Sequence, residues 1–233
     1  MTVLHVLSAG AAKGLVQRMQ EPFSAARGVS FEGAFGAVGA MREKLLAREP
    51  CDLIILTAAI IDALAAQGLV HADSVAALGR VHTGIAVPAG EAHPAIADAD
   101  GLRRALEVAR GIYLPDPERA TAGIHFANVL RALGIFDRVR ERLRPFPNGA
   151  AAMRAMADAG EPGLIGCTQV TEINYTVGVE LVGLLPREFE LATTYSLAVC
   201  AAAAEPALAR EFAGLLIGPA SLALRVKGGF VVD

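Results

Sequence analysis

Along residues 1–80, short apolar runs alternate with longer segments whose apolar residues recur at helical spacing. The runs at residues 3–7, 29–35 and 52–57 predict strands, and the segments at 12–20, 37–48 and the stretch ending at residue 66 predict helices. The run at 52–57 is apolar at every position except its two ends. Strands that are apolar on both faces are typical of a parallel sheet covered by helices, so the pattern predicts an α/β fold.

A second α/β block follows residue 80. Residues 81–87 have the pattern of a strand, and Pro88, Gly90 and Pro94 then break it. Further strands are predicted at 111–114, 163–168, 179–185 and 191–200, and further helices at 98–110, 121–133, 150–159, 206–217 and 219–226. The basic run at 138–144 is interpreted as the solvated end of a helix. The block predicts a second lobe.

The composition excludes several classes of protein. The 233 residues are 54% hydrophobic and 19% charged, with a mean hydropathy of +0.45, which excludes a disordered chain. The net charge of −3 shows no excess of the basic residues that bind nucleic-acid phosphates, so no nucleic-acid partner is expected. Every apolar run is interrupted well before the roughly 20 residues that a spanning helix needs, so no membrane span is expected.

Location and redox state are also predicted from the chain as printed. Residues 1–16 contain no cationic leader before an apolar stretch, which predicts a cytoplasmic protein, or a periplasmic one if a signal peptide was removed. Cys51, Cys167 and Cys200 are widely spaced among apolar neighbours and odd in number. This pattern favours buried reduced thiols over disulfides or a metal site. No metal and no cofactor are expected.

Three turns rich in small residues follow the first three predicted strands, at residues 8–14, 33–39 and 57–59. Small residues allow backbone N–H groups to converge on an anion at the positive end of a helix, and tight strand-to-helix turns are the simpler alternative. Because the carboxyl ends of parallel strands share one edge, three such turns predict a common ligand crevice. The nucleotide motifs G-x-G-x-x-G and G-x-x-x-x-G-K-[ST] are absent, which disfavours nucleotides.

Two later segments extend this set. In residues 116–126, Thr121 can cap a helix that presents the N–H groups of Ala122 and Gly123, and His125 lies in the first turn as a neutral ring or as a packing residue. In residues 166–172, Thr168 and Gln169 follow an apolar strand and can donate to a ligand. The alternative is an ordinary strand-ending turn with Thr171 as a cap.

Seven segments in this order resemble the type II periplasmic binding proteins, specifically the molybdate-binding-protein-like solute-binding family of ABC importers. They are SAGAAKGL, GAFGAVGAMREKL, EPCDLIILTAAIIDAL, DPERATAGIHFANVLRALGI, IGCTQVTEI, ATTYSLAV and FAGLLIGPASLALRVKGGF. The resemblance implies a two-lobed α/β fold with two crossover strands and a ligand cleft between the lobes. It implies one lobe from residues 1–82 and 196–233 and another from residues 83–195.

The departures from the family pattern bear on the ligand. Molybdate binders of this family place serine hydroxyls in the first two loops, where this chain has Ala11 and either Ala37 or Val38. We therefore expect a small organic anion, a di- or tricarboxylate, rather than molybdate. The expected ligand-binding residues are Ser8, Ala9, Gly10, Lys13, Ala37, Val38, Thr57, Thr121, Ala122, Gly123, Thr168 and Gln169. An ABC permease is an expected partner only if the protein is exported.

An enzymatic reading stays open beside the binding one. The same family architecture supports aconitate isomerase activity, so the resemblance also implies an allylic proton shift in an unsaturated carboxylic acid. The catalytic candidates are Lys13 and His125, with Glu172 and Tyr195 as weaker choices. A sensor that signals anion binding to another protein is the third reading.

Overall fold

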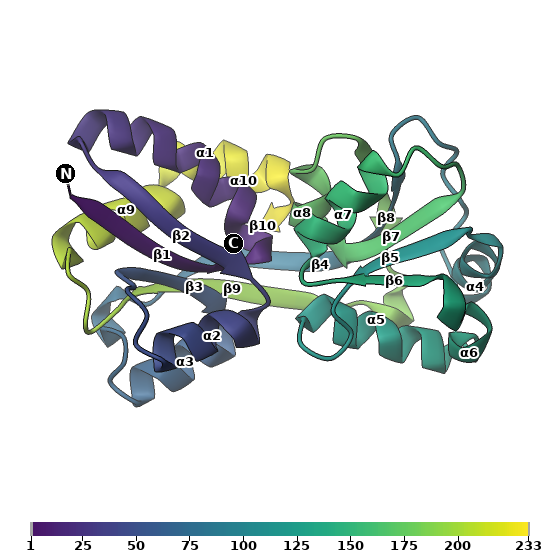
Figure 1. The fold of residues 1–233 in the computed structure, drawn as a ribbon, viewed down its shortest axis with the longest axis horizontal. Helices are drawn as coiled ribbons and strands as arrows, with labels where there is room; N and C mark the ends of the chain where they lie inside the picture. Colours follow the sequence, from purple (N-terminus) through teal and green to yellow (C-terminus); the bar gives the residue numbers. More distant parts are fainter. Residues whose placement is uncertain (1, 233) are drawn as a thin grey trace. The chain divides into compact units, whose positions relative to one another are not determined.

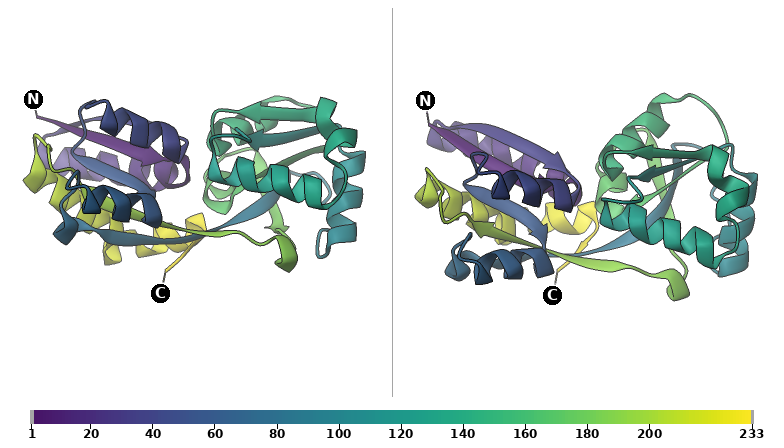
Figure 2. Two further views of the ribbon diagram at one scale, coloured as in Figure 1. Left: turned by 90° about the horizontal axis from the view of Figure 1, so that it is seen from below. Right: turned by 60° about the horizontal axis from the view of Figure 1, so that its bottom comes forward.

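The computed structural model describes residues 2–232, and these form two compact units. Unit 1 contains the chain up to Val81 and from Thr193 onward, and unit 2 is His82–Ala192. The chain passes between them twice, through β4 (Ala76–Pro88) and at the start of β9 (Ala192–Val199), which Figure 2 shows in blue and yellow-green. From the sequence we expected these boundaries after residues 82 and 195.

Unit 1 is built on a sheet with three parallel strands. They are β1 (Val3–Ala9), β2 (Ser30–Gly36) and β3 (Leu53–Thr57), in the order β2-β1-β3, and β9 runs antiparallel beside β3. The first half of β4 pairs with β10 (Phe230–Val231). Leu53 to Leu56 are fully buried, because helices cover this strand on both faces as its apolar pattern predicted.

Five helices cover the sheet of unit 1: α1 (Gly10–Arg27), α2 (Val38–Leu46), α3 (Ala58–Ala66), α9 (Pro206–Ile217) and α10 (Pro219–Gly228). A 3-10 turn, Ala72–Ser74, precedes β4. Figure 1 shows α1, α9 and α10 on one face of this sheet and α2 and α3 on the other. Leu7, Ile54 and Leu56 face α2 and α3, where they pack against Met41, Ile61 and Leu64.

Helix α1 begins earlier and ends later than its predicted span of 12–20. It continues through Pro22, which is exposed, although proline removes one hydrogen bond from the helix. The next residue explains the extension, because the buried Phe23 ring lies 5.1 Å from that of Phe212 and 5.9 Å from that of Phe31. Tertiary packing therefore stabilises the last turns of α1 against the local effect of the proline.

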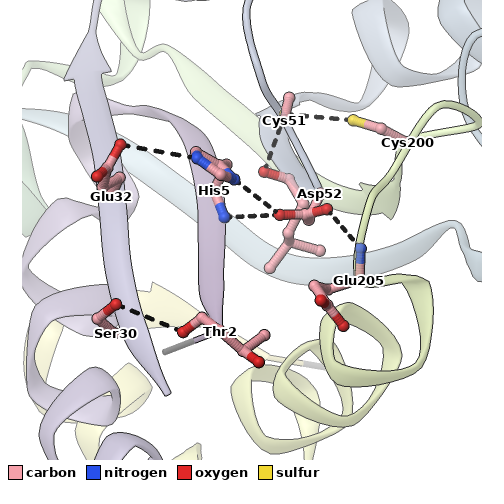
Figure 3. Close-up of polar contacts among 9 residues, drawn as sticks. Thr2, His5, Ser30, Glu32, Cys51, Asp52, Cys200 and Glu205 are labelled. Carbon is pink, nitrogen blue, oxygen red and sulfur yellow. Dashed lines mark hydrogen bonds and ion pairs between the residues drawn. The ribbon is translucent and has the colours of Figure 1, made fainter.

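A buried carboxylate ties three segments of unit 1 together, as Figure 3 shows. Asp52 is 1% exposed and accepts hydrogen bonds from the backbone N–H of His5 at 2.7 Å and of Glu205 at 2.9 Å. Its Oδ2 also lies 3.2 Å from His5 Nδ1. These contacts join β1, the start of β3 and the segment that leads into α9.

Unit 2 contains a second sheet with three parallel strands. They are β5 (Gly111–Pro115), β6 (Leu143–Phe146) and β7 (Leu164–Gln169), in the order β7-β5-β6. The second half of β4 runs antiparallel to β7 and also to β8 (Val179–Leu184). The sheet therefore repeats the parallel arrangement of unit 1.

Helices cover both faces of this second sheet. They are α4 (Ala99–Val108), α5 (Thr121–Ala132), α6 (Phe136–Val139), α7 (Gly149–Asp158) and α8 (Val170–Asn174), with 3-10 turns at Arg140–Arg142 and Arg187–Phe189. In Figure 1, α4, α5 and α6 lie on one face and α7 and α8 on the other. The cores agree: Ile112 and Leu114 pack with Phe126 of α5, whereas Tyr113 packs with Met153 of α7.

The interpretation of residues 138–144 as a helix end was partly wrong. Only α6 and a 3-10 turn lie there, and β6 begins at Leu143. The arginines explain the strand, because Arg142 donates to the carbonyls of Glu107 and Ala109, and Arg144 donates to the hydroxyl of Tyr113 at 2.8 Å. Arg142 thus binds the segment that leads into β5, and Arg144 binds β5 itself. Both contacts anchor β6, which is an edge strand of the sheet.

No single helix within residues 2–232 is long and apolar enough to cross a membrane. Taken together, α9 and α10 pass that test of length and composition, but the pair is bent by 57°.

Candidate functional site

Three helices of unit 1 begin directly at the carboxyl ends of its parallel strands. The register pairs Ala9 with Gly36 and Ser8 with Ile55, so β1, β2 and β3 end at the same edge of the sheet. α1 starts immediately after β1, α3 immediately after β3, and α2 one residue beyond β2. The amino termini of α1, α2 and α3 are therefore neighbours.

These three amino termini have no side-chain cap. The N-cap residues Ala9, Ala37 and Thr57 make no capping hydrogen bond, although the threonine has a hydroxyl that could make one. The N–H groups of the first turn thus lack a side-chain acceptor, and the helix dipole makes this end positive. The edge formed by α1, α2 and α3 has the chemistry of an anion-binding surface.

Lys13 adds a full positive charge at this edge. It lies in the first turns of α1, one residue past the predicted start of the helix, and is half-buried. Its Nζ is 5.9 Å from the centre of the Phe35 ring, and among residues 2–232 no carboxylate forms an ion pair with it. The ammonium group is therefore available to a negatively charged ligand.

The corresponding edge of unit 2 contains the amino terminus of α5. Asp116 shapes the preceding loop, since its Oδ1 accepts from the N–H of Glu118 at 2.8 Å and of Arg119 at 3.1 Å. A Cβ atom on Gly123 would lie 2.2 Å from the Asp116 carbonyl oxygen, so only glycine allows α5 to approach β5 this closely. The N-cap position is Ala120, which has no polar side chain, and the amides of Thr121, Ala122 and Gly123 form the uncapped first turn.

Gln169 lies at the same edge, on the α5 face of the sheet. Successive residues of a strand alternate between faces, and Ile165 and Cys167 of β7 pack in the core with α5, so Gln169 shares their face. Thr83 of β4 is its direct cross-strand neighbour, on the face of Ile85. The fold thus places an amide and a hydroxyl side by side near the start of α5.

These two side chains are buried without hydrogen-bond partners. Gln169 is 3% exposed and Thr83 is 1% exposed, yet among the described residues nothing pairs with Gln169 Nε2, Gln169 Oε1 or Thr83 Oγ1. Thr171 Oγ1, on α8, is in the same condition. Unpaired buried polar groups are unfavourable by about 1–3 kcal/mol each, so the set needs an external explanation such as a bound ligand.

On the opposite face, Thr168 and Glu172 satisfy each other. Thr168 Oγ1 donates to Glu172 Oε2 at 2.5 Å, and Glu172 Oε1 accepts from the Ala150 N–H at 3.2 Å. A Cβ atom on Gly149 would clash with both side chains, so the glycine at the start of α7 makes room for them. Burial raises the pKa of the Glu172 carboxyl, although its hydrogen bonds act to lower it. Here an internal carboxylate occupies a helix amino terminus.

Three candidates from the sequence have an internal hydrogen-bond partner. Ser8 is fully buried and donates to the Ala9 carbonyl at 3.0 Å, and Thr168 donates to Glu172. His125 Nε2 lies 2.7 Å from the Phe189 carbonyl oxygen, so this nitrogen carries a proton and donates it. These internal contacts orient the three side chains, and the expected roles of Ser8 and Thr168 as ligand contacts and of His125 as a base stay predictions.

The remaining candidates divide between the two units. Unit 1 brings together Ala9, Gly10, Lys13, Ala37, Val38 and Thr57, and unit 2 brings together Thr121, Ala122, Gly123 and Gln169. Thr171 lies inside α8, not at a cap position, because β7 extends to Gln169. Sequence reasoning missed Thr83. The signal that could have found it is a threonine among the apolar residues of the strand predicted at 81–87.

Family membership follows from comparison with known proteins. A family model described as bacterial extracellular solute-binding protein matches residues 4–231. The chain belongs to this family. The match spans both units of the solute-binding protein, and it confirms the resemblance drawn from the seven sequence segments.

Individual relatives agree on the fold of this solute-binding protein. The periplasmic molybdate-binding protein of Azotobacter vinelandii is 19% identical, with a TM-score of 0.77 and coverage of 99% of both chains. The sulfate-binding protein of Mycobacterium tuberculosis is 18% identical, with a TM-score of 0.72, covering 99% of this chain and 86% of that one. These structures confirm the two-lobed α/β fold.

A curated relative has a different activity. An aconitate isomerase from a Pseudomonas species is 28% identical over 219 residues, which covers 90% of this chain and 80% of the relative. The chain is therefore similar both to proteins named for binding and to a protein named for catalysis.

Proposed function

We propose that this solute-binding protein binds a small organic anion with two or three carboxylates. The candidate binding groups of unit 1 are the uncapped amides of α1, α2 and α3 and the Lys13 ammonium. Those of unit 2 are the α5 amides and Gln169. Backbone N–H groups and an ammonium group only donate hydrogen bonds, which suits carboxylate oxygens.

The observation that carries this proposal is the pair of unpaired atoms on Gln169. One is a donor and one is an acceptor, and this remains true whichever way the amide is oriented. A fully ionised tetrahedral oxyanion has only acceptors and leaves the amide oxygen unpaired. An organic acid that carries a hydroxyl or a protonated carboxyl group supplies both a donor and an acceptor. Gln169 therefore favours an organic acid over molybdate or sulfate.

Isothermal titration calorimetry with a panel of anions tests the proposal. The panel contains cis-aconitate, trans-aconitate, citrate, malate and succinate, with molybdate and sulfate as inorganic comparisons. We expect at least one organic acid to bind more tightly than both inorganic anions. Tighter binding of molybdate or sulfate would contradict the proposal.

Lys13 provides the first mutational test. Lys13→Met keeps the length of the side chain and removes its charge, so it should weaken binding of the preferred carboxylate by at least about 1 kcal/mol, roughly fivefold in Kd. Lys44→Met is the matched control, because Lys44 lies at the end of α2 and pairs with Glu49 at 2.8 Å. Unchanged affinity in the Lys13 variant would remove this residue from the site.

The second candidate function is isomerisation of an unsaturated carboxylic acid, and the similarity to aconitate isomerase supports it. An allylic proton shift needs a base that removes a proton from one carbon and returns it to another, while an anion clamp stabilises the intermediate charge. Lys13 and His125 are the candidate proton carriers, because no carboxylate among residues 2–232 pairs with the Lys13 ammonium and a His125 ring that donates from Nε2 keeps its Nδ1 lone pair, whereas both oxygens of Glu172 have internal partners.

Turnover separates the two functions. The protein is incubated with cis-aconitate or trans-aconitate, and the olefinic proton signals are followed by NMR. Conversion that Lys13→Met abolishes would support the isomerase. Stoichiometric binding of the same acids without conversion would support the binding protein.

A further inference from the structure

Two of the three cysteines lie in direct contact within unit 1. Cys51 Sγ and Cys200 Sγ are 3.2 Å apart, as Figure 3 shows, and the two residues are 7% and 1% exposed. The backbone holds them in place, because Cys51 precedes β3 and Cys200 follows its antiparallel partner β9. The N–H of Cys200 also donates to the carbonyl of Asp52 at 2.9 Å.

The contact is close to the geometry of a bond. A disulfide places its sulfurs at about 2.05 Å, so the two atoms need to approach by only about 1.2 Å. We propose that Cys51 and Cys200 are a disulfide-forming site, which a small-molecule disulfide oxidises while Cys167 stays reduced. Cys167 belongs to unit 2 and is fully buried in a different core.

The oxidation proceeds by two thiol–disulfide exchanges. The Cys51 thiolate attacks one sulfur of glutathione disulfide, which breaks the S–S bond and releases one glutathione thiolate. The Cys200 thiolate then attacks the Cys51 sulfur and releases the second glutathione. The protein loses two electrons and two protons in total, and glutathione disulfide gains them to become two thiols.

Burial determines when this reaction occurs. The hydrogen bond to the Cys51 sulfur and burial raise the pKa of the Cys200 thiol far above its ordinary value. Folded protein should therefore react slowly, because Cys200 remains a thiol and glutathione has little access. Protein that refolds in the presence of the oxidant should form the bond readily as β3 and β9 pair.

The position of the bond gives it a defined effect on stability. It joins the segment of unit 1 before the chain enters unit 2 to the segment after it returns, across 149 residues of sequence. A bond that closes so long a loop restricts the unfolded chain. Oxidised protein should unfold at a higher urea concentration than reduced protein, and dithiothreitol should abolish the difference.

Peptide mapping of wild-type protein is the direct test. The chain is refolded in a glutathione redox buffer, alkylated and digested with trypsin without reduction. Cleavage after arginine places the three cysteines on separate peptides, residues 49–80, 155–187 and 188–210. We expect peptides 49–80 and 188–210 to be joined and peptide 155–187 to carry the alkyl group.

Variants supply the controls. Cys167→Ala should keep the cross-link, and Cys51→Ala and Cys200→Ala should each lose it. Three alkylated cysteines after refolding with the oxidant would overturn the proposal. Cross-links that include peptide 155–187 as often as the expected pair would also overturn it.

Discussion

Replacing Gln169 with leucine should have opposite effects on stability and on binding. The amide is buried, and among residues 2–232 neither of its polar atoms has a hydrogen-bond partner. Leucine fills a similar volume without polar atoms, so the substitution removes a penalty of about 1–3 kcal/mol for each of the two unpaired atoms and should raise the free energy of unfolding. If Gln169 binds the proposed ligand, the same substitution removes two hydrogen bonds to it. It should weaken binding by roughly 1–3 kcal/mol, or 5- to 150-fold.

Two measurements test the predicted gain in stability and loss of affinity. The free energy of unfolding comes from urea titrations followed by far-UV circular dichroism, since the chain has no tryptophan. Affinity comes from calorimetry with the carboxylate that wild-type protein binds most tightly. Thr83→Val should also raise the free energy of unfolding and weaken binding, both by smaller amounts, because Thr83 has one unpaired hydroxyl.

Thr176→Val is the matched control. Thr176 is also a buried polar residue near α8, but its hydroxyl donates to the Glu172 carbonyl at 2.7 Å. Its replacement should destabilise the protein by about 1 kcal/mol and leave affinity unchanged. If Gln169→Leu behaves like this control, the amide is a structural residue and the reasoning from its unpaired atoms is refuted.

Two further predictions concern buried carboxylates. Asp52→Asn keeps one acceptor oxygen and loses the other, so the backbone N–H of either His5 or Glu205 loses its partner. Urea titration should show that the free energy of unfolding falls by about 1–3 kcal/mol. The control Glu32→Gln should change it little, because the Glu32 side chain is 73% exposed. A loss below about 0.5 kcal/mol would contradict the role given to Asp52. The pKa of Glu172 is raised above its ordinary 4.5 by burial, so its protonated form stabilises the fold at low pH and that contribution is lost as pH rises through the raised pKa. Relative to Glu172→Gln, wild-type stability should therefore fall as pH rises above 4.5 and through the raised pKa, and a difference independent of pH would show that the pKa is not raised.

The buried strands and amphipathic helices could be predicted from the sequence because burial imposes their patterns locally. β3 is apolar on both faces, and α9 runs from Pro206 to Ile217 as expected. β6 could not be found this way, because arginine contacts to distant carbonyls anchor it and its own residues show no alternation. α8 has five residues, too few for a helical period to show.

The candidate site was predicted where it depends on the backbone and less well where it depends on side chains. Small residues after parallel strands indicated the starts of α1, α2 and α3. The role of His125 depends on the Phe189 carbonyl, 64 residues away, and that of Thr168 on a carboxylate whose place is set by Gly149 of α7. Such partners are fixed by tertiary packing, which no local pattern contains.

The distribution of helix caps supports the proposed function independently of Gln169. This chain can cap its helices: Asp98 accepts from Gly101 at the start of α4, and Asn148 accepts from Ala151 at the start of α7. α9 and α10 begin with proline, which has no N–H group.

The four long helices that start at the carboxyl edges of the parallel strands without an internal acceptor are α1, α2, α3 and α5. A capping side chain stabilises a helix by about 1 kcal/mol, so these termini together forgo roughly 4 kcal/mol, a large part of the stability of an ordinary domain. α7 also starts at such an edge, but there the Glu172 side chain accepts a hydrogen bond from the first turn. The contrast indicates that the other four termini lack a carboxylate partner. An external carboxylate would supply to them what Glu172 supplies to α7.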